Sequence, residues 1–199
     1  YGFDEAESFF YLILEDKFQM KRLDLALDPA FEFSADALNV WEELVTQLKT
    51  EIPIQYLLGN TEFFGLSFLV NENVLIPRPE TEELVDWIIE EEKKMERLKD
   101  REIEGLKDRG IERHRDVKIL DIGTGSGCIA ISLAKNIPKA TVFAIDVSAK
   151  ALEVAKKNGE INKVSVTFLE KNILETDDLL EQFDIIVSNP PYVRNLEKV

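Results

Sequence analysis

The chain has 199 residues, an apolar fraction of 45% and a formal charge of −15, so we expect one large domain or two smaller ones with ordinary hydrophobic cores. The strong negative charge argues against a nucleic-acid substrate, since binding to phosphate backbones needs clustered basic residues. One histidine, His114, and one cysteine, Cys128, exclude a multi-histidine metal site and a disulfide framework. We expect a cytoplasmic protein without a metal, and no membrane span, because no apolar run approaches the roughly 20 residues that a bilayer requires.

Residues 1–51 are predicted to form a small helical domain. Apolar residues recur with helical spacing in 5–18 and in 34–50, and Ser34 or Asp36 is a candidate N-cap for the second helix. The segment between them carries a proline and is expected to be a connector.

Residues 52–76 are predicted to form a β-hairpin that links this domain to the rest of the chain. The runs TEFFGLSFLV and NVLI are rich in aromatic and β-branched residues, and the hairpin turn is expected at Asn71–Asn73. The segment PRPETE follows, with Thr81 as the candidate N-cap of a helix that includes Trp87 as a core residue.

Charged side chains of both signs dominate residues 90–116. We expect this insertion to be a solvated helix or a mobile segment, because opposite charges three or four residues apart lend a helix modest support. No chemistry is assigned to it.

From residue 117 onward, strands and helices are predicted to alternate. Buried strands alternating with helices are typical of a parallel, doubly wound sheet. An open sheet of this kind usually has more than four strands, so we expect its last strands to fall beyond this chain. The predicted strands are 117–123, 141–148, 165–172 and 183–188, and the predicted helices are 128–137, 150–162 and a short piece at 177–182.

The first of these strands leads into a glycine-rich loop, Asp121-Ile122-Gly123-Thr124-Gly125-Ser126-Gly127. Glycines at the start of a helix let the backbone approach a ligand closely. The spacing is G-x-G-x-G, whereas a dinucleotide site needs G-x-G-x-x-G. The acid before the first glycine suits a cofactor that carries an ammonium group rather than a pyrophosphate.

Two further strand ends carry residues that suit a nucleoside. Asp146 ends the next strand, about twenty residues beyond the glycines, where a carboxylate can accept hydrogen bonds from both hydroxyls of a ribose. Asn172 and Ile173 end the third strand, and could offer an amide to an adenine edge and an apolar face to its ring. An ordinary loop is equally compatible with that pair.

The fourth strand ends in the loop Asn189-Pro190-Pro191-Tyr192. Prolines cannot continue a sheet ladder, so a stiff loop follows the strand. The Asn189 side-chain oxygen and the Pro190 carbonyl could accept both hydrogens of a planar amino nitrogen and favour its pyramidal transition state. Tyr192 could pack its ring against the planar group. The loop is therefore a candidate catalytic site for a reaction at such a nitrogen.

The glycine-rich loop resembles that of class I S-adenosylmethionine-dependent methyltransferases, and NPPY marks the members that methylate planar amino groups. The segment PIQYLLGNTEFFGLSFLVNENVLIPRPETEELV, after a small helical domain, is similar to protein-(glutamine-N5) methyltransferases of peptide-chain release factors. The resemblance implies an α/β fold: a Rossmann-like class I methyltransferase sheet, preceded by the helical domain and the linking hairpin. It runs from about residue 50 to 193, interrupted by the charged insertion, and covers the N-terminal helices more loosely.

The resemblance also implies roles for individual residues, with S-adenosyl-L-methionine as the cofactor. The methionine part of the cofactor would be held by Asp121, Gly123, Thr124, Gly125, Ser126 and Gly127. Asp146 would hold the ribose, and Asn172 and Ile173 the adenine, although the family commonly has an acid where Asn172 stands. The substrate glutamine would be bound by Asn189, Pro190, Pro191 and Tyr192. The signature residues Arg78, Glu80 and Thr81 would border the pocket.

By the same resemblance, residues 1–51 would recognise the substrate and residues 77–199 would form the S-adenosylmethionine-binding domain. The implied activity is methyl transfer to the glutamine N5 of the Gly-Gly-Gln motif in a peptide-chain release factor, which modulates translation termination. One alternative is N-methylation of adenine N6 or guanine N2 in DNA or ribosomal RNA, which predicts a basic surface. Another is a cofactor-binding module without catalysis, which would have no use for Asn189 and Tyr192.

Overall fold

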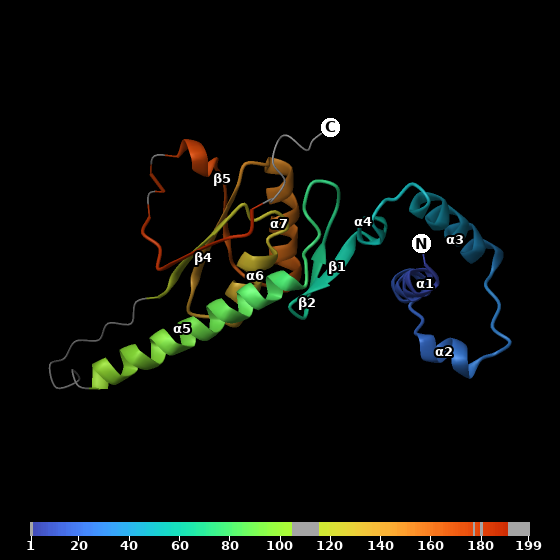
Figure 1. Cartoon of the computed structure of the whole chain (residues 1–199), viewed down its shortest axis with the longest axis horizontal. Coiled ribbons are helices and arrows are strands. Elements are labelled where there is room, and N and C mark those ends of the chain that lie inside the picture. Colours follow the sequence, from blue (N-terminus) through green and yellow to red (C-terminus); the bar gives the residue numbers. More distant parts are fainter. Residues whose placement is uncertain (1, 105–115, 177, 180, 191–199) are drawn as a thin grey trace. The chain divides into compact units, whose positions relative to one another are not determined.

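The computed structural model describes residues 2–104, 116–176, 178, 179 and 181–190, with the backbone alone for 99–104 (Figure 1). The chain divides into two compact units, Tyr1–Asn60 and Thr61–Val199. The predicted boundaries at 51 and 76 stay a prediction. Pro191 and Tyr192 lie outside the described residues, as does the part of the charged insertion from 105 to 115. Among the helices that are described, none combines the length and the hydropathy needed to cross a bilayer.

The N-terminal unit is helical, as predicted. Its core buries four aliphatic side chains, Ile13, Leu44, Leu48 and Ile54, and the Trp41 ring stacks against both Phe10 and Phe18. Ser34 is the N-cap of the third helix, because its hydroxyl accepts a hydrogen bond from Ala37 N at 3.2 Å. The helices are α1 (Phe3–Phe18), α2 (Arg22–Leu27), α3 (Ala35–Leu48) and α4 (Ile54–Leu58).

A two-stranded hairpin follows, but the prediction for residues 52–76 was wrong in three details. Residues 54–58 are helix α4, the run NVLI is not a strand, and the turn lies at another place. The strands are β1 (Asn60–Phe63) and β2 (Leu66–Leu69), and the turn between them is Phe64-Gly65 rather than Asn71–Asn73. Phe64 and Gly65 have φ angles of 51° and 69°, and two consecutive residues with positive φ give the turn whose twist matches a hairpin. A phenylalanine is an unusual residue for that conformation, and Gly65 is the one residue of the turn whose type indicates it.

The second unit contains the predicted parallel sheet. Its strands are β3 (Lys118–Ile122), β4 (Thr141–Asp146), β5 (Thr167–Glu170) and β6 (Ile185–Ser188), in the order β5-β4-β3-β6. All three pairings are parallel, and the helices α6 (Cys128–Asn136) and α7 (Ala149–Asn162) connect β3 to β4 and β4 to β5. The prediction of a short helix at 177–182 is wrong. Its described residues are not helical, and a single 3₁₀ turn lies earlier, at Ile173–Glu175.

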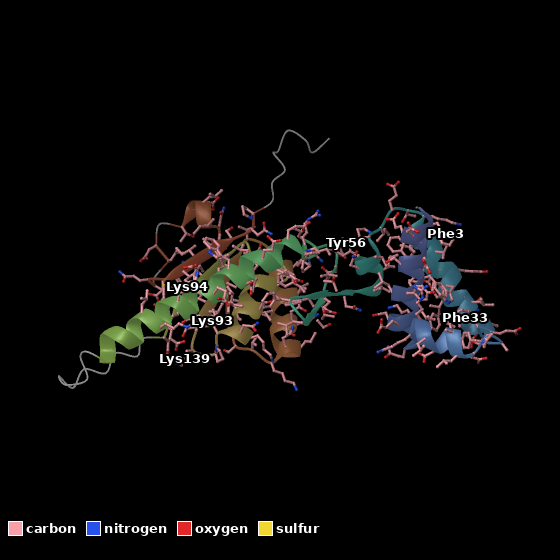
Figure 2. All side chains as sticks on the ribbon, turned by 60° about the horizontal axis from the view of Figure 1, so that its bottom comes forward. Phe3, Phe33, Tyr56, Lys93, Lys94 and Lys139 are labelled. Carbon is pink, nitrogen blue, oxygen red and sulfur yellow. The ribbon has the colours of Figure 1, made fainter. Side chains whose placement is uncertain are left out.

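Helix α5 (Glu80–Glu104) absorbs the first part of the charged insertion, which is therefore a solvated helix as far as it is described. Ion pairs link Lys93 to Glu90 and Lys94 to Glu91 along the exposed face, and the three labelled lysines in Figure 2 lie on and beside this helix. Two predictions about this helix were wrong. Thr81 lies inside its first turn rather than at the N-cap, and Trp87 is 63% exposed rather than part of the core.

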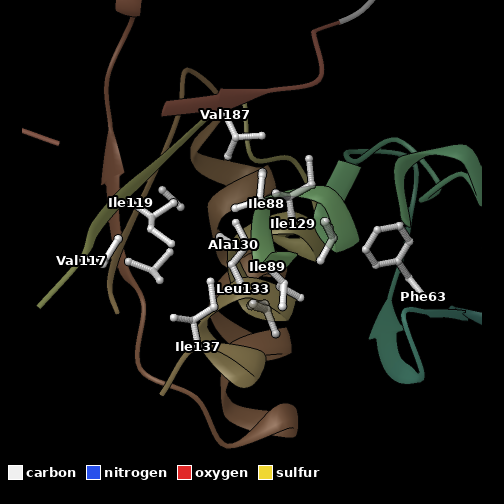
Figure 3. Packing of buried hydrophobic residues seen from close by; sticks show 14 of the residues in the cluster. Phe63, Ile88, Ile89, Val117, Ile119, Ile129, Ala130, Leu133, Ile137 and Val187 are labelled. Atoms are coloured by element: carbon white, nitrogen blue, oxygen red, sulfur yellow. The ribbon is translucent and has the colours of Figure 1, made fainter. Parts of the chain in front are cut away.

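The core of the second unit forms where α5 and α6 pack against the sheet and the hairpin (Figure 3). The apolar side of α5 contributes Val85, Ile88 and Ile89, which recur at helical spacing. Phe63 and Phe68 of the hairpin pack edge to face, with ring centroids 6.0 Å apart. This packing fixes the start of α5 beside the sheet.

Candidate functional site

The predicted site residues that follow β3, β4 and β6, as far as the structure describes them, come together at one edge of the sheet. Because the four strands are parallel, their carboxyl ends lie at the same edge. Ile122 is level with Ile145 on one side and with Ser188 on the other. The residues that follow these three positions are therefore neighbours: the glycine-rich loop, Asp146 and Asn189.

The glycine-rich loop folds back over the end of β4. Gly123 N and Thr124 N both donate hydrogen bonds to the Ile145 carbonyl, at 2.9 and 3.0 Å. Gly123, Gly125 and Gly127 all have positive φ angles, a conformation that residues with a Cβ adopt only at a cost. At Gly127 space is also lacking, because a Cβ there would lie 2.9 Å from Ile131 Cδ1.

Asp121 is the buried acid of the loop. Its Oδ2 accepts a hydrogen bond from Thr124 Oγ1 at 2.6 Å, whereas its buried Oδ1 has no partner among the described residues. Burial raises the pKa of Asp121 to about 6. Interactions with the Thr124 hydroxyl and the Ala130 backbone N–H oppose this shift, and the nearby Asp146 carboxylate adds to it. A buried carboxylate oxygen without a donor is costly, so an ammonium group placed there would be strongly favoured.

Asp146, the last residue of β4, binds the backbone of the glycine-rich loop. Its Oδ2 accepts a hydrogen bond from Gly125 N and its Oδ1 accepts one from Ser148 N, each at 2.9 Å. A carboxylate oxygen has more than one lone pair, so both oxygens retain the capacity to accept from ribose hydroxyls. The carboxylate therefore fixes the glycine-rich loop against the start of α7.

Asn172 forms a local cap beyond β5. Its Oδ1 accepts a hydrogen bond from Leu174 N at 3.0 Å, and its carbonyl accepts one from the Thr176 hydroxyl at 2.7 Å. The preceding residue, Lys171, donates its backbone N–H to the Asp146 carbonyl at 3.0 Å. The segment with Asn172 and Ile173 is thus tied to the same sheet edge, and their contact with an adenine stays a prediction.

Asn189 lies directly after β6, and Pro190 follows it. The Asn189 side chain donates from Nδ2 to the Thr81 hydroxyl oxygen at 3.0 Å, across a separation of 108 residues. Ser188 donates from its hydroxyl to the Ile122 carbonyl at 2.8 Å, which joins the end of β6 to the end of β3. The two ends that carry the glycine-rich loop and Asn189 are therefore held side by side.

Sequence reasoning missed the two asparagines that support this edge from α7. Asn158 is completely buried and donates from Nδ2 to the Ser126 carbonyl at 2.9 Å. Asn162, one turn later, donates to the Ser67 carbonyl of the hairpin, also at 2.9 Å. Two amides at i and i+4 on the apolar side of a helix were a readable signal, because buried polar side chains need partners. Glu82 was also missed, and its Oε1 accepts a hydrogen bond from Phe64 N at 2.9 Å.

No group of three or more His, Cys, Asp or Glu residues suited to a metal occurs in the described part of the chain.

Comparison with known proteins gives two matching domains. Residues 1–59 match the model of the PrmC N-terminal domain, and residues 106–199 match that of the methyltransferase small domain. In solved structures, a tRNA (uracil-54, C5)-methyltransferase of Pyrococcus abyssi covers 66% of this chain and 28% of its own, with 25% identity and a TM-score of 0.46.

Curated relatives match nearly the whole chain. The release factor glutamine methyltransferase of Flavobacterium psychrophilum is 61% identical over 194 residues, which are 98% of this chain and 62% of that protein. The Bacteroides thetaiotaomicron protein of the same name is 41% identical over 196 residues, 98% of this chain and 63% of that protein. The chain thus spans a little over three fifths of the length of these relatives. By its sequence, its helical N-terminal unit and its parallel sheet, the chain belongs to the release factor glutamine methyltransferase family.

Proposed function

We propose that this chain carries the cofactor site and the reacting site of an enzyme that methylates the Gly-Gly-Gln glutamine of a peptide-chain release factor on N5. The observation that carries the proposal is the placement of Asn189 beside the glycine-rich loop, at adjacent strand ends that the Ser188–Ile122 hydrogen bond joins. An acceptor-bearing loop next to a cofactor loop is the arrangement that transfer to a planar nitrogen requires.

The described residues fit S-adenosyl-L-methionine. The unpartnered Oδ1 of Asp121 suits the ammonium group of its methionine part, and the glycine-rich loop from Gly123 to Gly127 would surround that part. Asp146 would accept the ribose hydroxyls, and Asn172 with Ile173 would border the adenine. When bound, S-adenosyl-L-methionine supplies an electrophilic methyl group.

The chain's own contribution to the reaction is to hold the substrate nitrogen. A glutamine amide nitrogen is a poor nucleophile because its lone pair is delocalised into the carbonyl. The Asn189 side-chain oxygen and the Pro190 carbonyl would accept its two hydrogens, which fixes the nitrogen and stabilises the pyramidal transition state more than the planar ground state. Tyr192 would pack against the planar amide, and the surplus proton would leave to solvent.

A protein substrate suits the rest of the chain better than a nucleic acid. The formal charge of −15 disfavours phosphate backbones, and the relatives at 61% and 41% identity are named for release factors. The N-terminal helical unit would recognise the release factor, with the hairpin linking it to the methyltransferase domain. The enzyme would act in the cytoplasm, where translation terminates.

A competition experiment tests the proposal. The chain, extended to the length of its relatives, would receive methyl-labelled S-adenosylmethionine in one tube with purified release factor, duplex DNA and ribosomal RNA. Label on the release factor is expected, and it should disappear when the Gly-Gly-Gln glutamine is replaced by alanine. Label on DNA or RNA would instead establish methylation of an exocyclic base amine. The Asn189→Ala variant should bind S-adenosylhomocysteine but transfer no methyl group, whereas a cofactor-binding module would give no label with either protein.

A further inference from the structure

Thr81 of helix α5 and Asn189, which follows strand β6, are far apart in sequence but form a hydrogen bond with each other. Thr81 lies in the first turn of α5 and is 8% exposed. Its hydroxyl oxygen accepts the hydrogen bond from Asn189 Nδ2 at 3.0 Å. Both groups of this pair are charge-neutral, so its consequence is geometric: it fixes the direction in which the Asn189 amide points.

The direction matters because an asparagine amide has two unlike ends. With Nδ2 bonded to Thr81, the Oδ1 end is turned away from Thr81, and it is the end that accepts hydrogen bonds. In the reverse orientation the Thr81 hydroxyl would donate to Oδ1, and the NH₂ group would take the place of Oδ1. An NH₂ group facing a substrate NH₂ group would present donors to donors, and the nitrogen could not be held.

Thr81 is itself held firmly. Its backbone N–H donates to the Arg78 carbonyl at 2.9 Å, and the next residue, Glu82, accepts from Phe64 N of the hairpin turn at 2.9 Å. One turn further along α5, the fully buried Val85 belongs to the same core cluster as Val187, two residues before Asn189. The donor and the acceptor of the pair therefore stand on elements that share one packed core.

We propose that Thr81 is a positioning residue for methyl transfer: it binds Nδ2 of Asn189 and thereby presents Oδ1 to the hydrogens of the substrate nitrogen. The inference rests on the proposed function for the identity of the substrate, but the amide orientation can be measured without it. It also gives a role to one residue of the PRPETE signature, which the sequence left without one.

The activity test compares two substitutions at Thr81 in the chain extended to the length of its relatives. Thr81→Val keeps the shape of the side chain and removes the hydroxyl, whereas Thr81→Ser keeps the hydroxyl. We expect Thr81→Val to lower kcat by about 10- to 100-fold, because misplacement of a reacting group costs rates of that order. The kcat of Thr81→Ser should stay within about threefold of wild type. Both variants should leave the Kd for S-adenosylhomocysteine within about twofold, because binding of this ligand involves neither the transferred methyl group nor the substrate nitrogen that Asn189 would hold. Glu83→Gln, an exposed change in the same helical turn, is the matched control.

A second readout is independent of activity. The Asn189 side-chain NH₂ would be observed by ¹⁵N NMR and assigned by its disappearance in Asn189→Ala. In the wild type, one Nδ2 proton should be shifted downfield and exchange slowly with solvent, and Thr81→Val should abolish both effects while Thr81→Ser retains them. If no release factor is methylated but the NMR pattern holds, the proposed function fails and the orientation stands. The positioning role is overturned if Thr81→Val leaves kcat and the NH₂ signals unchanged, or if it lowers kcat with the NH₂ signals unchanged.

Discussion

Asn158 on α7 holds the backbone of Leu69 on β2 with both atoms of its side-chain amide. Its Oδ1 accepts from Leu69 N at 2.7 Å and its Nδ2 donates to the Leu69 carbonyl at 3.0 Å. The same Nδ2 donates to the carbonyl of Ser126 in the glycine-rich loop. A single buried side chain thus takes the place of a further strand beside β2 and ties the hairpin to the glycine-rich loop.

The first prediction concerns the loss of this amide. Asn158→Leu is close in volume and leaves three backbone groups without their partners. We expect it to lower the free energy of unfolding by about 3 kcal/mol, because each buried group left unsatisfied costs about 1–3 kcal/mol and some will find water. Urea unfolding followed by circular dichroism measures it. Lys157→Ala, an exposed change on the same helix, should cost less than about 0.5 kcal/mol, and a similarly small loss for Asn158→Leu would show that the clamp contributes little.

The second prediction separates crowding from backbone strain in the glycine-rich loop. At Gly127, with φ of 80°, an added Cβ would lie 2.9 Å from Ile131 Cδ1 and 3.1 Å from Ala155 Cβ. At Gly123, with φ of 72°, a Cβ would meet nothing within 4 Å. Gly123→Ala should therefore cost about 1–2 kcal/mol, the usual penalty of the left-handed region, whereas Gly127→Ala should cost about 1–3 kcal/mol more through overpacking. Equal melting temperatures for the two variants would mean that the Ile131 side chain and α7 can both move away from the loop at no cost.

The third prediction is a dependence of stability on pH at Asp121. Burial raises the pKa of this carboxyl from its ordinary 3.8 to about 6, so the folded protein binds this proton more tightly than the unfolded chain does. The stability that Asp121 contributes is therefore fully present below about pH 4 and is lost as the pH rises through about 6. A shift of this size corresponds to about 3 kcal/mol.

The measurement is the free energy of unfolding between pH 4 and pH 7. Relative to Asp121→Asn, which cannot ionise, the wild type should lose up to about 3 kcal/mol across that range. Asp86→Asn, an exposed change on α5, should run parallel to the wild type. Because an ammonium group favours the ionised carboxylate, binding of S-adenosylhomocysteine should weaken by about tenfold between pH 7 and pH 5. A flat pH profile for both quantities would contradict this environment for Asp121.

The fourth prediction concerns Asp146, whose two oxygens each accept a backbone N–H. Asp146→Asn leaves only one acceptor oxygen, so either Gly125 N or Ser148 N loses its partner. We expect the Kd for S-adenosylhomocysteine to rise by about tenfold or more, through the disturbed loop and the loss of the proposed ribose contacts. Isothermal titration calorimetry measures it. Glu170→Gln, at the position level with Asp146 on the neighbouring strand, is the control, and an equal effect there would mean that only net charge matters.

Much of the second unit could be predicted from sequence because its local signals agree. Strands β3, β4, β5 and β6 all lie within their predicted ranges, since continuous apolar runs bounded by turn residues have few alternatives. The hairpin turn was misplaced because Gly65 was its one turn signal, whereas Phe64 adopts a positive φ that its residue type does not indicate. Trp87 was expected in the core because tryptophans usually are, yet its position on α5 leaves it largely exposed.

The sequence by itself determined the succession of strands and helices along the second unit, the glycine-rich loop, and which residues end each strand. Periodicity and turn chemistry, on which these predictions rest, are local properties. Family membership also follows from the sequence. Only the tertiary structure decided which side chains pair across the chain: Thr81 with Asn189, and Asn158 with Leu69 and Ser126. It also decided that Oδ1 of Asp121 is buried without a partner among the described residues. Such pairs join residues up to 108 positions apart, and their partners are chosen by the packing of α5 and α7 against the hairpin and the sheet, which no local pattern encodes.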